Sequence, residues 1–392
     1  MAVAACQLGH RPVVVDDGLE HGALGRRPED PLDPDFASTD ERRRARHVGC
    51  GHGGSVVPLV APINRAENPV VVAVVVFVPL HVAAGGHDLD VAPYLLFDLF
   101  RAGVGQYLLD VDPALAQFDP AATPLEQFGE LVDAIHARGA RIFLDIAINH
   151  TGWAARMHGM HPEWLSRDDG GRIEVPGAWG VQWEDLTRLD YSHRELWHFM
   201  ADMFITWCRR GVDGFRCDAG YMIPQPAWRY MIAKVRQQFP DTIFFLEGLG
   251  GKISVTRDLL NRAGFNWAYS ELFQNYDRGQ IEAYLPQAFD ISGSDGLTVN
   301  YAETHDNLRL AERSETFARM RTALCALCSS QGGFGFANGV EWYATEKINV
   351  HGASSLNWGS KTNQVKHIRR LNTLLKTHPA FHDRTELKML QK

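Results

Sequence analysis

Apolar runs alternate with amphipathic stretches along most of the chain after Pro69. The longest apolar run, 70–78, has the length of a strand that is buried on both faces. Shorter apolar runs follow later in the chain and end at turn residues. They predict further strands. These strands are expected at 106–111, 142–148, 212–215, 242–246, 266–269 and 297–301, and near Phe334.

Helical spacing of apolar residues lies between several of these runs. Residues 123–126 read Thr-Pro-Leu-Glu, which combines an N-cap threonine, a proline at the first helical position and a glutamate three residues after the cap. Gly139 ends that helix. A second capping box at 192–195 predicts a helix that Gly211 ends. Other helices are expected at 94–101, 226–238 and 315–328.

Strand and helix alternate about eight times over roughly 260 residues, which predicts an α/β fold and, within that class, a (β/α)₈ TIM barrel. A doubly wound sheet would carry a glycine-rich phosphate loop after its first strand, and neither a G-x-G-x-x-G nor a Walker A pattern follows the run 70–78. We expect the barrel at 66–378. Residues 1–65 show no periodicity and predict an N-terminal extension, and 379–392 are expected to begin a truncated C-terminal region.

The composition and net charge argue against some classes of binding partner. The 392 residues are 45% hydrophobic and 22% charged, with a formal net charge of −8, which argues against nucleic acid or an anionic membrane as a partner. The six cysteines are scattered, and the C-x-x-C pair Cys325 and Cys328 lies in an apolar helical stretch that indicates core packing. No secretory signal pattern is visible at the start of the chain, so we expect a cytoplasmic protein. The oligomeric state is left open.

Charged and polar residues gather where the predicted strands end. In a barrel, the carboxyl ends of the strands form the rim that carries the active site. Arg216 and Asp218 follow one strand two residues apart, so both side chains point to the same side. The other residues at strand ends are Asp145, Asn149, His150, Glu247 and the run 303–306. Four clusters on one rim indicate a catalytic site rather than isolated ion pairs.

These clusters lie in four short segments. They are FLDIAINH (143–150), GFRCDAGYM (214–222), FFLEGLGG (244–251) and AETHDN (302–307). In residue types and in order, the segments resemble the four conserved regions of the α-amylase superfamily of glycoside hydrolases. The resemblance implies a TIM barrel whose stretch 151–191 is an excursion after the third strand that roofs the cleft.

The resemblance also implies catalytic roles. Asp218 would be the nucleophile that forms a covalent glycosyl-enzyme, and Glu247 would be the general acid and then the base. Asp306 would bind the sugar hydroxyls and favour a distorted ring. Arg216 would keep Asp218 ionised, and Asp145 would orient Arg216.

Other positions of the superfamily match less completely. His150 and His305 would bind the sugar at the cleavage point, and Tyr221 would stack on a sugar face. Asn149 is a candidate calcium ligand, but calcium-dependent members carry Lys-His where this chain has Tyr221 and Met222. We therefore expect that no cofactor is required and that a structural calcium ion is doubtful.

The residue types suit this chemistry independently of the resemblance. A retaining glycosidase uses one carboxylate of low pKa and one of raised pKa. Arg216 is placed to lower the pKa of Asp218, and the apolar run 243–246 before Glu247 predicts a raised pKa for that carboxyl group.

These patterns predict a retaining hydrolase or transglycosylase that acts on α-glucosidic bonds of α-glucans or oligosaccharides. Hydrolysis and transfer share one site, so the sequence does not separate them. An inactive barrel that binds α-glucans as a regulatory module is the alternative. A third hypothesis, a metal-dependent barrel hydrolase, requires activity that chelation removes.

Overall fold

The computed structural model describes residues 2–7, 70–76, 96–98, 108–110, 121–137, 139–153, 155–178, 180–249, 251–329, 332–348, 357 and 359–381. For the first four of these segments only the backbone is considered. The predicted N-terminal extension beyond residue 7, and residues 382–392 of the predicted C-terminal region, lie outside the described part of the chain.

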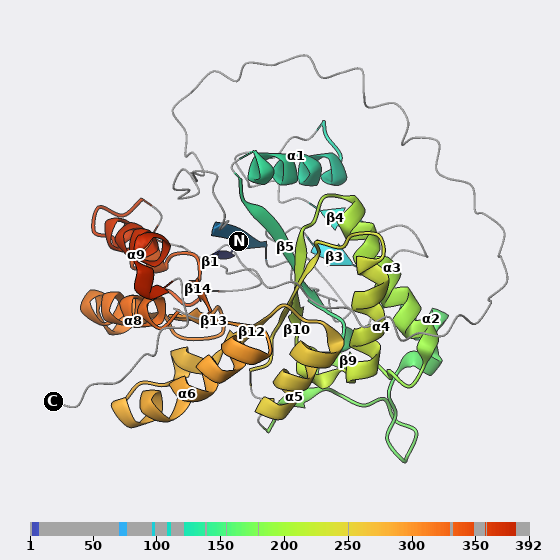
Figure 1. The fold of residues 1–392 in the computed structure, drawn as a ribbon. Coiled ribbons are helices and arrows are strands. Elements are labelled where there is room, and N and C mark those ends of the chain that lie inside the picture. The colour runs from blue at the N-terminus through green and yellow to red at the C-terminus, as the bar shows by residue number, and fades with distance from the viewer. Residues whose placement is uncertain are drawn as a thin grey trace. The chain divides into compact units, whose positions relative to one another are not determined.

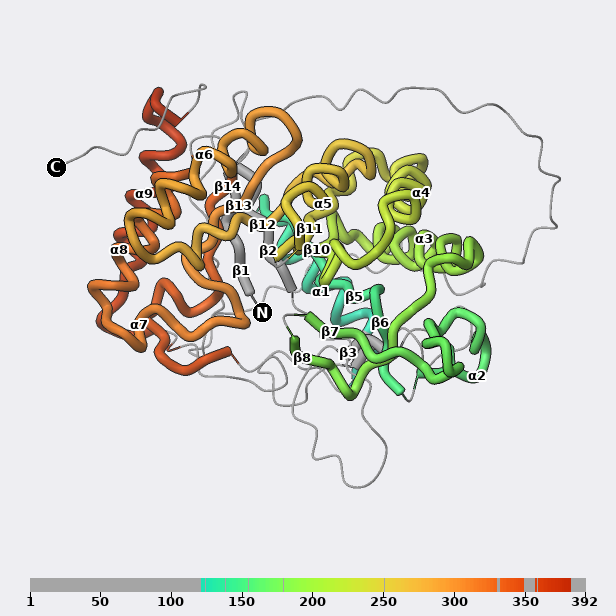
Figure 2. The backbone as a smooth tube through the Cα atoms, turned by 90° about the horizontal axis from the view of Figure 1, so that it is seen from below, coloured from blue at the N-terminus to red at the C-terminus, as the bar shows by residue number. Residues whose placement is uncertain are grey.

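The centre of the fold is an eight-stranded sheet (Figure 1). Its strands, in spatial order, are β1 (Ala2–Gln7), β2 (Val70–Val76), β5 (Arg141–Ala147), β10 (Gly214–Asp218), β11 (Ile243–Leu246), β12 (Trp267–Ser270), β13 (Leu297–Tyr301) and β14 (Gly333–Gly335). Neighbours from β2 to β14 are parallel, whereas β1 runs antiparallel to β2. Figure 2 shows β10 to β14 following one another in this order. The predicted α/β class is confirmed, and carboxyl ends of the parallel strands share one edge.

Helices connect the strands and pack on the sheet. They are α1 (Pro124–His136), α3 (Arg194–Arg209), α4 (Gln225–Arg236), α5 (Ile253–Asp258), α6 (Arg278–Ser294), α7 (Leu310–Arg313), α8 (Glu315–Leu327) and α9 (Val365–Thr377). Helix α1 packs on β5, and α6 and α8 pack on β13. A π-helical turn, η5 (Leu259–Ala263), extends α5. Short 3₁₀ turns are η3 (Pro162–Trp164), η4 (Gly220–Met222), η6 (Glu271–Gln274), η7 (Val340–Trp342) and η8 (Pro379–Phe381).

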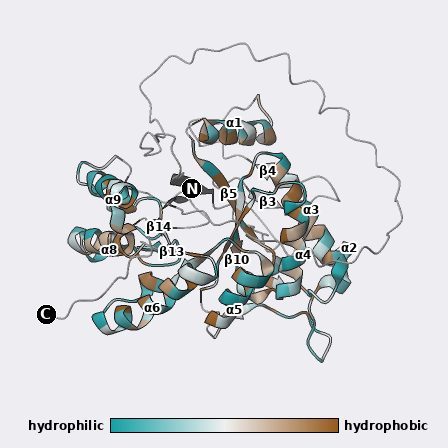
Figure 3. Ribbon diagram, in the orientation of Figure 1, coloured by the Kyte–Doolittle hydropathy of each residue, from teal (hydrophilic) through white to brown (hydrophobic). Residues whose placement is uncertain are grey.

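From β5 to β14, both faces of the sheet are buried. Alternate residues such as Phe215 and Phe244 contact the helices, while Phe143, Phe245 and Trp267 pack together on the opposite face. This burial explains why the strands appear in the sequence as continuous apolar runs. Helix α1 carries both hydrophobic and hydrophilic residues (Figure 3), as expected for a helix with one buried face. In the described part of the chain, no helix is both long and apolar enough to cross a bilayer.

Only one of the two predicted capping boxes forms. Thr123 and Glu126 make the reciprocal hydrogen bonds at the start of α1, as expected. Helix α3 begins instead at Arg194, and its N-cap residue His193 makes no side-chain cap. The prediction at 192–195 is wrong because the Ser192 backbone N–H is already bound to the Asp190 carboxylate, which closes a turn before the helix.

Of two predictions before α1, one is wrong and the other is confirmed only as a strand. The segment 94–101 was expected to be helical, but β3 (Leu96–Asp98) is a strand that pairs antiparallel with β4 (Leu108–Asp110). This pair forms its own two-stranded sheet, so β4 is not part of the main sheet, and β2 lies directly beside β5. Short apolar runs do not distinguish helix from strand, and long-range pairing decides which strands are neighbours.

The two ends of the polar segment between β5 and α3 pair with each other. Strand β6 (His150–Gly152) pairs with β9 (Leu186–Arg188). Between them lie α2 (Met157–Met160), η3 and a small hairpin of β7 (Gly177–Ala178) and β8 (Val181–Gln182). His150 therefore lies in β6, shortly after β5, where this segment leaves the main sheet.

The cysteines Cys325 and Cys328 are buried in the core cluster of α8, as predicted. Burial raises the pKa of the Cys325 thiol to about 12 and that of the Cys328 thiol to about 11, so both thiols are protonated at neutral pH. Core packing is therefore confirmed for this pair.

Candidate active site

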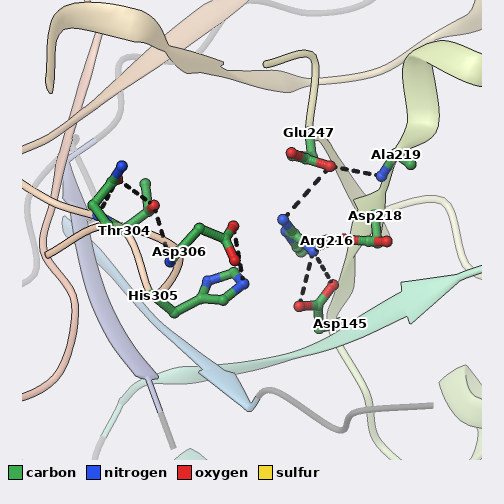
Figure 4. Close-up of polar contacts among 9 residues, drawn as sticks. Asp145, Arg216, Asp218, Ala219, Glu247, Thr304, His305 and Asp306 are labelled. Atoms are coloured by element: carbon green, nitrogen blue, oxygen red, sulfur yellow. Dashed lines mark hydrogen bonds and ion pairs between the residues drawn. The ribbon is translucent and has the colours of Figure 1, made fainter. Parts of the chain in front are cut away.

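One guanidinium group organises the candidate site (Figure 4). Parallel pairing of β5 and β10 sets Arg216 opposite Asp145. Arg216 Nη1 donates to both carboxylate oxygens of Asp145, at 2.8 and 3.0 Å, and to Asp218 Oδ1 at 2.5 Å. Its Nη2 lies 3.7 Å from Glu247 Oε2. Three strand ends therefore bring three carboxyl groups to one cation, and the predicted contact between Arg216 and Asp218 is confirmed.

Burial and charge move the pKa values of these carboxyl groups in different directions. Burial raises the pKa of Glu247 to about 7, and Arg216 only partly offsets this effect. Burial also raises the pKa of Asp145 to about 7. Burial acts in the same direction on Asp218, but the positive charge of Arg216 and the neighbouring His150 outweigh it, so the pKa of Asp218 is lowered. Two carboxyl groups of raised pKa, Asp145 and Glu247, and one of lowered pKa, Asp218, thus stand beside the same guanidinium.

The residue after Asp218 makes a contact that the sequence did not predict. Ala219 adopts a left-handed backbone with φ of +46°, which is uncommon for a residue with a Cβ atom. In this conformation its N–H donates to Glu247 Oε2 at 2.6 Å. The backbone next to Asp218 therefore holds the carboxyl group of Glu247. No side-chain pattern signals such a contact.

Asp306 and His305 face this cluster from the loop after β13 (Figure 4). His305 Nε2 lies 3.4 Å from Asp306 Oδ2, and the Asp306 side chain is 68% exposed. The charge of Asp306 contributes to the raised pKa values of Asp145 and Glu247, so this carboxylate acts on the same site. Burial and the charge of Arg216 lower the pKa of His305 to about 4, which leaves its imidazole neutral.

His150 and Tyr221 lie at the edges of the cluster. His150 is buried, its ring meets Trp183 edge to face with centroids 5.7 Å apart, and burial lowers its pKa. Within the described residues its Nδ1 has no hydrogen-bond partner. Tyr221 in η4 lines a cavity of about 350 Å³ between the starts of α4 and α5. Burial, then the charges of Glu247 and Asp218, raise the pKa of Tyr221 to about 12.

The sequence analysis also missed Tyr269. This residue lies in β12, and Arg216 Cζ is 5.6 Å from the centroid of its ring. Burial raises the pKa of Tyr269 to about 12, and its hydroxyl forms a hydrogen bond with Arg216. Tyr269 is the last residue of the strand predicted at 266–269, so the strand-end criterion used for the acidic residues would have found it.

The environment of Asn149 does not fit a calcium ion. Asn149 is buried, and its amide Nδ2 lies 3.2 Å from the thioether sulfur of Met222. Calcium takes oxygen ligands, and a thioether is a soft group that suits other metals. Among the described residues, no group of three or more His, Cys, Asp or Glu side chains is arranged to hold a metal. We therefore derive no step that uses calcium.

Comparisons with known proteins place this geometry in context. No protein-family model matches the chain. Over 291 residues, 69% of this chain, it is 28% identical to an α-1,4-glucan:maltose-1-phosphate maltosyltransferase of Cereibacter sphaeroides and covers 42% of that protein. Over 57% of its length it is 29% identical to a protein of the same name from Rhodospirillum rubrum and covers 32% of it. The chain thus spans less than half the length of these relatives.

Solved structures share the fold. An α-amylase from Lactobacillus plantarum superposes with a TM-score of 0.56 and 24% identity, over 66% of this chain and 64% of that chain. An α-amylase from Geobacillus thermoleovorans, complexed with acarbose, gives 0.55 and 15%, over 68% and 64%. The chain is thus similar in sequence to these maltosyltransferases and in fold to these α-amylases. The resemblance carried by the four segments is therefore supported by relatives and by solved structures.

Proposed function

We propose that this protein is a retaining enzyme that cleaves α-glucosidic bonds of α-glucans or oligosaccharides. The proposal rests on the guanidinium group of Arg216, which lies beside the carboxyl groups of both Asp218 and Glu247. Arg216 contacts Asp218, whose pKa is lowered, and lies beside Glu247, whose pKa burial raises to about 7. An ionised nucleophile and a protonated acid at one site are what the first step of a double displacement needs.

In the first step, the Asp218 carboxylate attacks the anomeric carbon while the bond to the leaving oxygen breaks. Glu247 gives its proton to that oxygen. Asp218 is then esterified to the sugar in the β configuration, and Glu247 is ionised. Neutral His150 and His305 would bind sugar hydroxyls. Asp306 would accept hydrogen bonds from the hydroxyls of a ring that flattens toward an oxocarbenium ion.

In the second step, Glu247 takes a proton from an acceptor hydroxyl, whose oxygen attacks the anomeric carbon and releases Asp218. Water gives hydrolysis and a glucan hydroxyl gives transfer. The names of the maltosyltransferase relatives favour transfer of maltosyl units from maltose 1-phosphate to an α-1,4-glucan.

The fold that we propose for this activity is a closed eight-stranded barrel, in which seven parallel strands lie within 66–378, β1 is the eighth and antiparallel strand, and 151–191 roofs the cleft. Residues of β1 and β14, at the two ends of the sheet order, lie within 8 Å of each other between Cα atoms, which supports closure. The contact of Trp183 with His150 supports the roofing role. We propose that catalysis requires no cofactor, because the mechanism needs only the chain's own acid, nucleophile and cation.

The test uses an activated donor so that chemistry can be followed even if natural acceptors bind weakly. Glu247→Gln is incubated with α-maltosyl fluoride, whose leaving group needs no proton. We expect a glycosyl-enzyme that accumulates and is found on Asp218 by mass spectrometry. Wild-type protein is then given maltose 1-phosphate with maltooligosaccharides, and released phosphate and chain length are measured.

Asp213→Asn is the matched control, because Asp213 directly precedes β10, at the end of that strand away from the site, and binds His136 and the Ile142 N–H instead. We expect this variant to retain activity, whereas Asp218→Asn forms no adduct. Binding of α-glucans without an adduct or turnover would favour the alternative, an inactive glucan-binding barrel.

A further inference from the structure

A second buried arginine lies directly behind the loop that carries His305 and Asp306. Glu303 begins this loop after β13, and Arg309 ends it before α7. Glu303 Oε2 accepts a hydrogen bond from the Leu310 N–H at 2.6 Å, and Glu303 Oε1 lies 3.0 Å from Arg309 Nε. The side chains of Arg309 and Glu303 are 0% and 2% exposed. The two ends of the loop are thus joined by a sealed ion pair.

Hydrogen bonds between residues of the loop stabilise its conformation. Thr304 Oγ1 donates to Asn307 Oδ1 at 2.6 Å, and the Asp306 N–H donates to Thr304 Oγ1 at 3.4 Å. The Asn307 N–H also donates to the Thr304 carbonyl, at 3.3 Å. The turn is therefore a small internally bonded unit, and its place relative to the sheet depends on what holds its two ends.

Arg309 also ties the loop to its neighbour. Its Nη2 donates to the carbonyl oxygen of Asn338, in the segment after β14, at 2.8 Å. There Glu341 Oε2 accepts from the Gly339 N–H at 2.9 Å, and its negative charge acts on both Glu303 and Arg309. The loop with Asp306 and the next segment of the rim are therefore fixed to each other through one guanidinium.

Stability alone does not explain these buried charges. Buried ion pairs often contribute no more to stability than well-packed apolar residues of the same volume, because desolvation offsets their attraction. The Asp306 side chain, by contrast, is 68% exposed, and its Oδ2 lies 3.4 Å from His305 Nε2. An exposed carboxylate cannot fix its own position, so the backbone that carries it must do so.

We propose that Glu303 and Arg309 are positioning residues that hold Asp306 and His305 against the Arg216 cluster. This proposal rests on the proposed function, because positioning Asp306 matters only if that carboxylate acts on a bound sugar. A displacement of about 1 Å at a catalytic group can lower activity about 10²-fold. The pair therefore controls kcat without touching substrate.

The test is a double-mutant cycle between this pair and Asp306. The variant Glu303→Gln/Arg309→Met removes both charges together, so no uncompensated buried charge remains. We expect it to lower kcat for an activated α-glucosyl fluoride about 10²-fold in the wild-type background. In the Asp306→Asn background the same two substitutions should lower kcat no further, because the group they position is already gone. An equal loss in both backgrounds would overturn the proposal.

Arg321→Met is the matched control. Arg321 is as deeply buried as Arg309 and donates to the carbonyl oxygens of Leu272, Phe273 and Asn275, in a loop that carries none of the proposed site residues. We expect Arg321→Met to lower thermal stability and to leave kcat close to wild type. A loss of kcat as large as that of the Glu303/Arg309 variant would mean that any buried arginine has this effect, and would also overturn the proposal.

A second measurement does not depend on turnover. The His305 imidazole is followed by NMR as a function of pH, and in the wild type it should stay neutral down to about pH 4. In Glu303→Gln/Arg309→Met, or in Glu303→Gln alone if the double variant does not fold, a displaced loop exposes His305 and its pKa rises toward its ordinary value. An unchanged titration would contradict the positioning role. Absence of turnover in the wild type would instead contradict the proposed function.

Discussion

Two buried arginines in this molecule each gather carboxyl groups, and they differ in access to solvent. Arg216 contacts Asp145 and Asp218 and lies 3.7 Å from Glu247, and the Asp218 side chain is 31% exposed. Arg309 contacts Glu303 and is influenced by the charge of Glu341, with both members of the ion pair almost fully buried. The first cluster can meet a substrate, whereas the second can act only through the backbone that it holds.

The pKa values separate the two clusters in the same way. Burial raises the pKa of Glu303 to about 7, as it does that of Glu247. Only the cluster around Arg216 also contains a carboxyl group whose pKa is lowered, that of Asp218. A buried arginine and a raised pKa are therefore shared by the proposed catalytic site and the sealed cluster. Opposite shifts on two carboxyl groups, one of them reaching solvent, distinguish the proposed catalytic site.

The largest difference between the clusters should appear on removing Asp218. Asp218→Asn leaves the shape of the site but removes the nucleophile, so we expect kcat to fall about 10⁴-fold or more. The measurement is steady-state turnover of an α-maltosyl donor. Glu341→Gln is the same type of change in the sealed cluster and should lower kcat far less. Similar losses in the two variants would remove the distinction between the clusters.

Loss of the acid should be the next largest effect. Glu247→Gln should lower kcat about 10²- to 10⁴-fold for a sugar leaving group and much less for fluoride, which needs no proton. In the wild type, kcat/KM should fall as pH rises through about 7, where Glu247 loses its proton. It should also fall at acidic pH below the lowered pKa of Asp218, where the nucleophile becomes protonated. An alkaline limb that persists unchanged in Glu247→Gln would show that another group titrates.

Much of the Arg216 cluster could be predicted from the sequence, because strand geometry determines its local part. Residues two apart in a strand share a side, which predicted the contact of Arg216 with Asp218. The apolar run before Glu247 predicted its raised pKa, which burial explains. The rule that active sites of barrels lie at strand ends predicts that Asp145, Glu247 and the 303–306 run lie together.

The remaining features depend on information that a linear pattern does not carry. The pairing of β2 with β5, and of Ala2–Gln7 with β2, is long-range, so 106–111 was assigned to the wrong sheet. The residue type of Ala219 does not indicate its left-handed backbone conformation. Glu303 and Arg309 are six residues apart in a loop, and only the fold shows that they meet.

A smaller effect concerns the pH dependence of stability. It would show that burial acts in the same way on a carboxyl group in each cluster. The pKa of Glu303 is about 7 in the folded chain, above its ordinary value of 4.5, so the folded state binds more protons between these values. The free energy of unfolding should therefore fall as pH rises from 4.5 to 7, by up to about 1.4 kcal/mol per pH unit from this group.

Glu303→Gln does not titrate and should remove that part of the slope, measured by denaturant unfolding at several pH values. Glu247→Gln should remove a similar part, because its pKa is raised in the same direction. The two variants would then differ in activity far more than in their pH-dependent stability. If Glu303→Gln kept the full wild-type slope, the buried carboxyl group would not be protonated in this window.

The smallest expected effect is that of a chelator. In both clusters a guanidinium is the cation that contacts the carboxyl groups, and the oxygen-rich surroundings that calcium needs are replaced at Asn149 by the Met222 sulfur. EDTA should therefore change neither kcat nor the melting temperature, and added calcium should not raise either. A melting temperature that falls in EDTA and returns with calcium would show that the cation organising this site is a metal ion, and that the comparison of two arginine-centred clusters is incomplete.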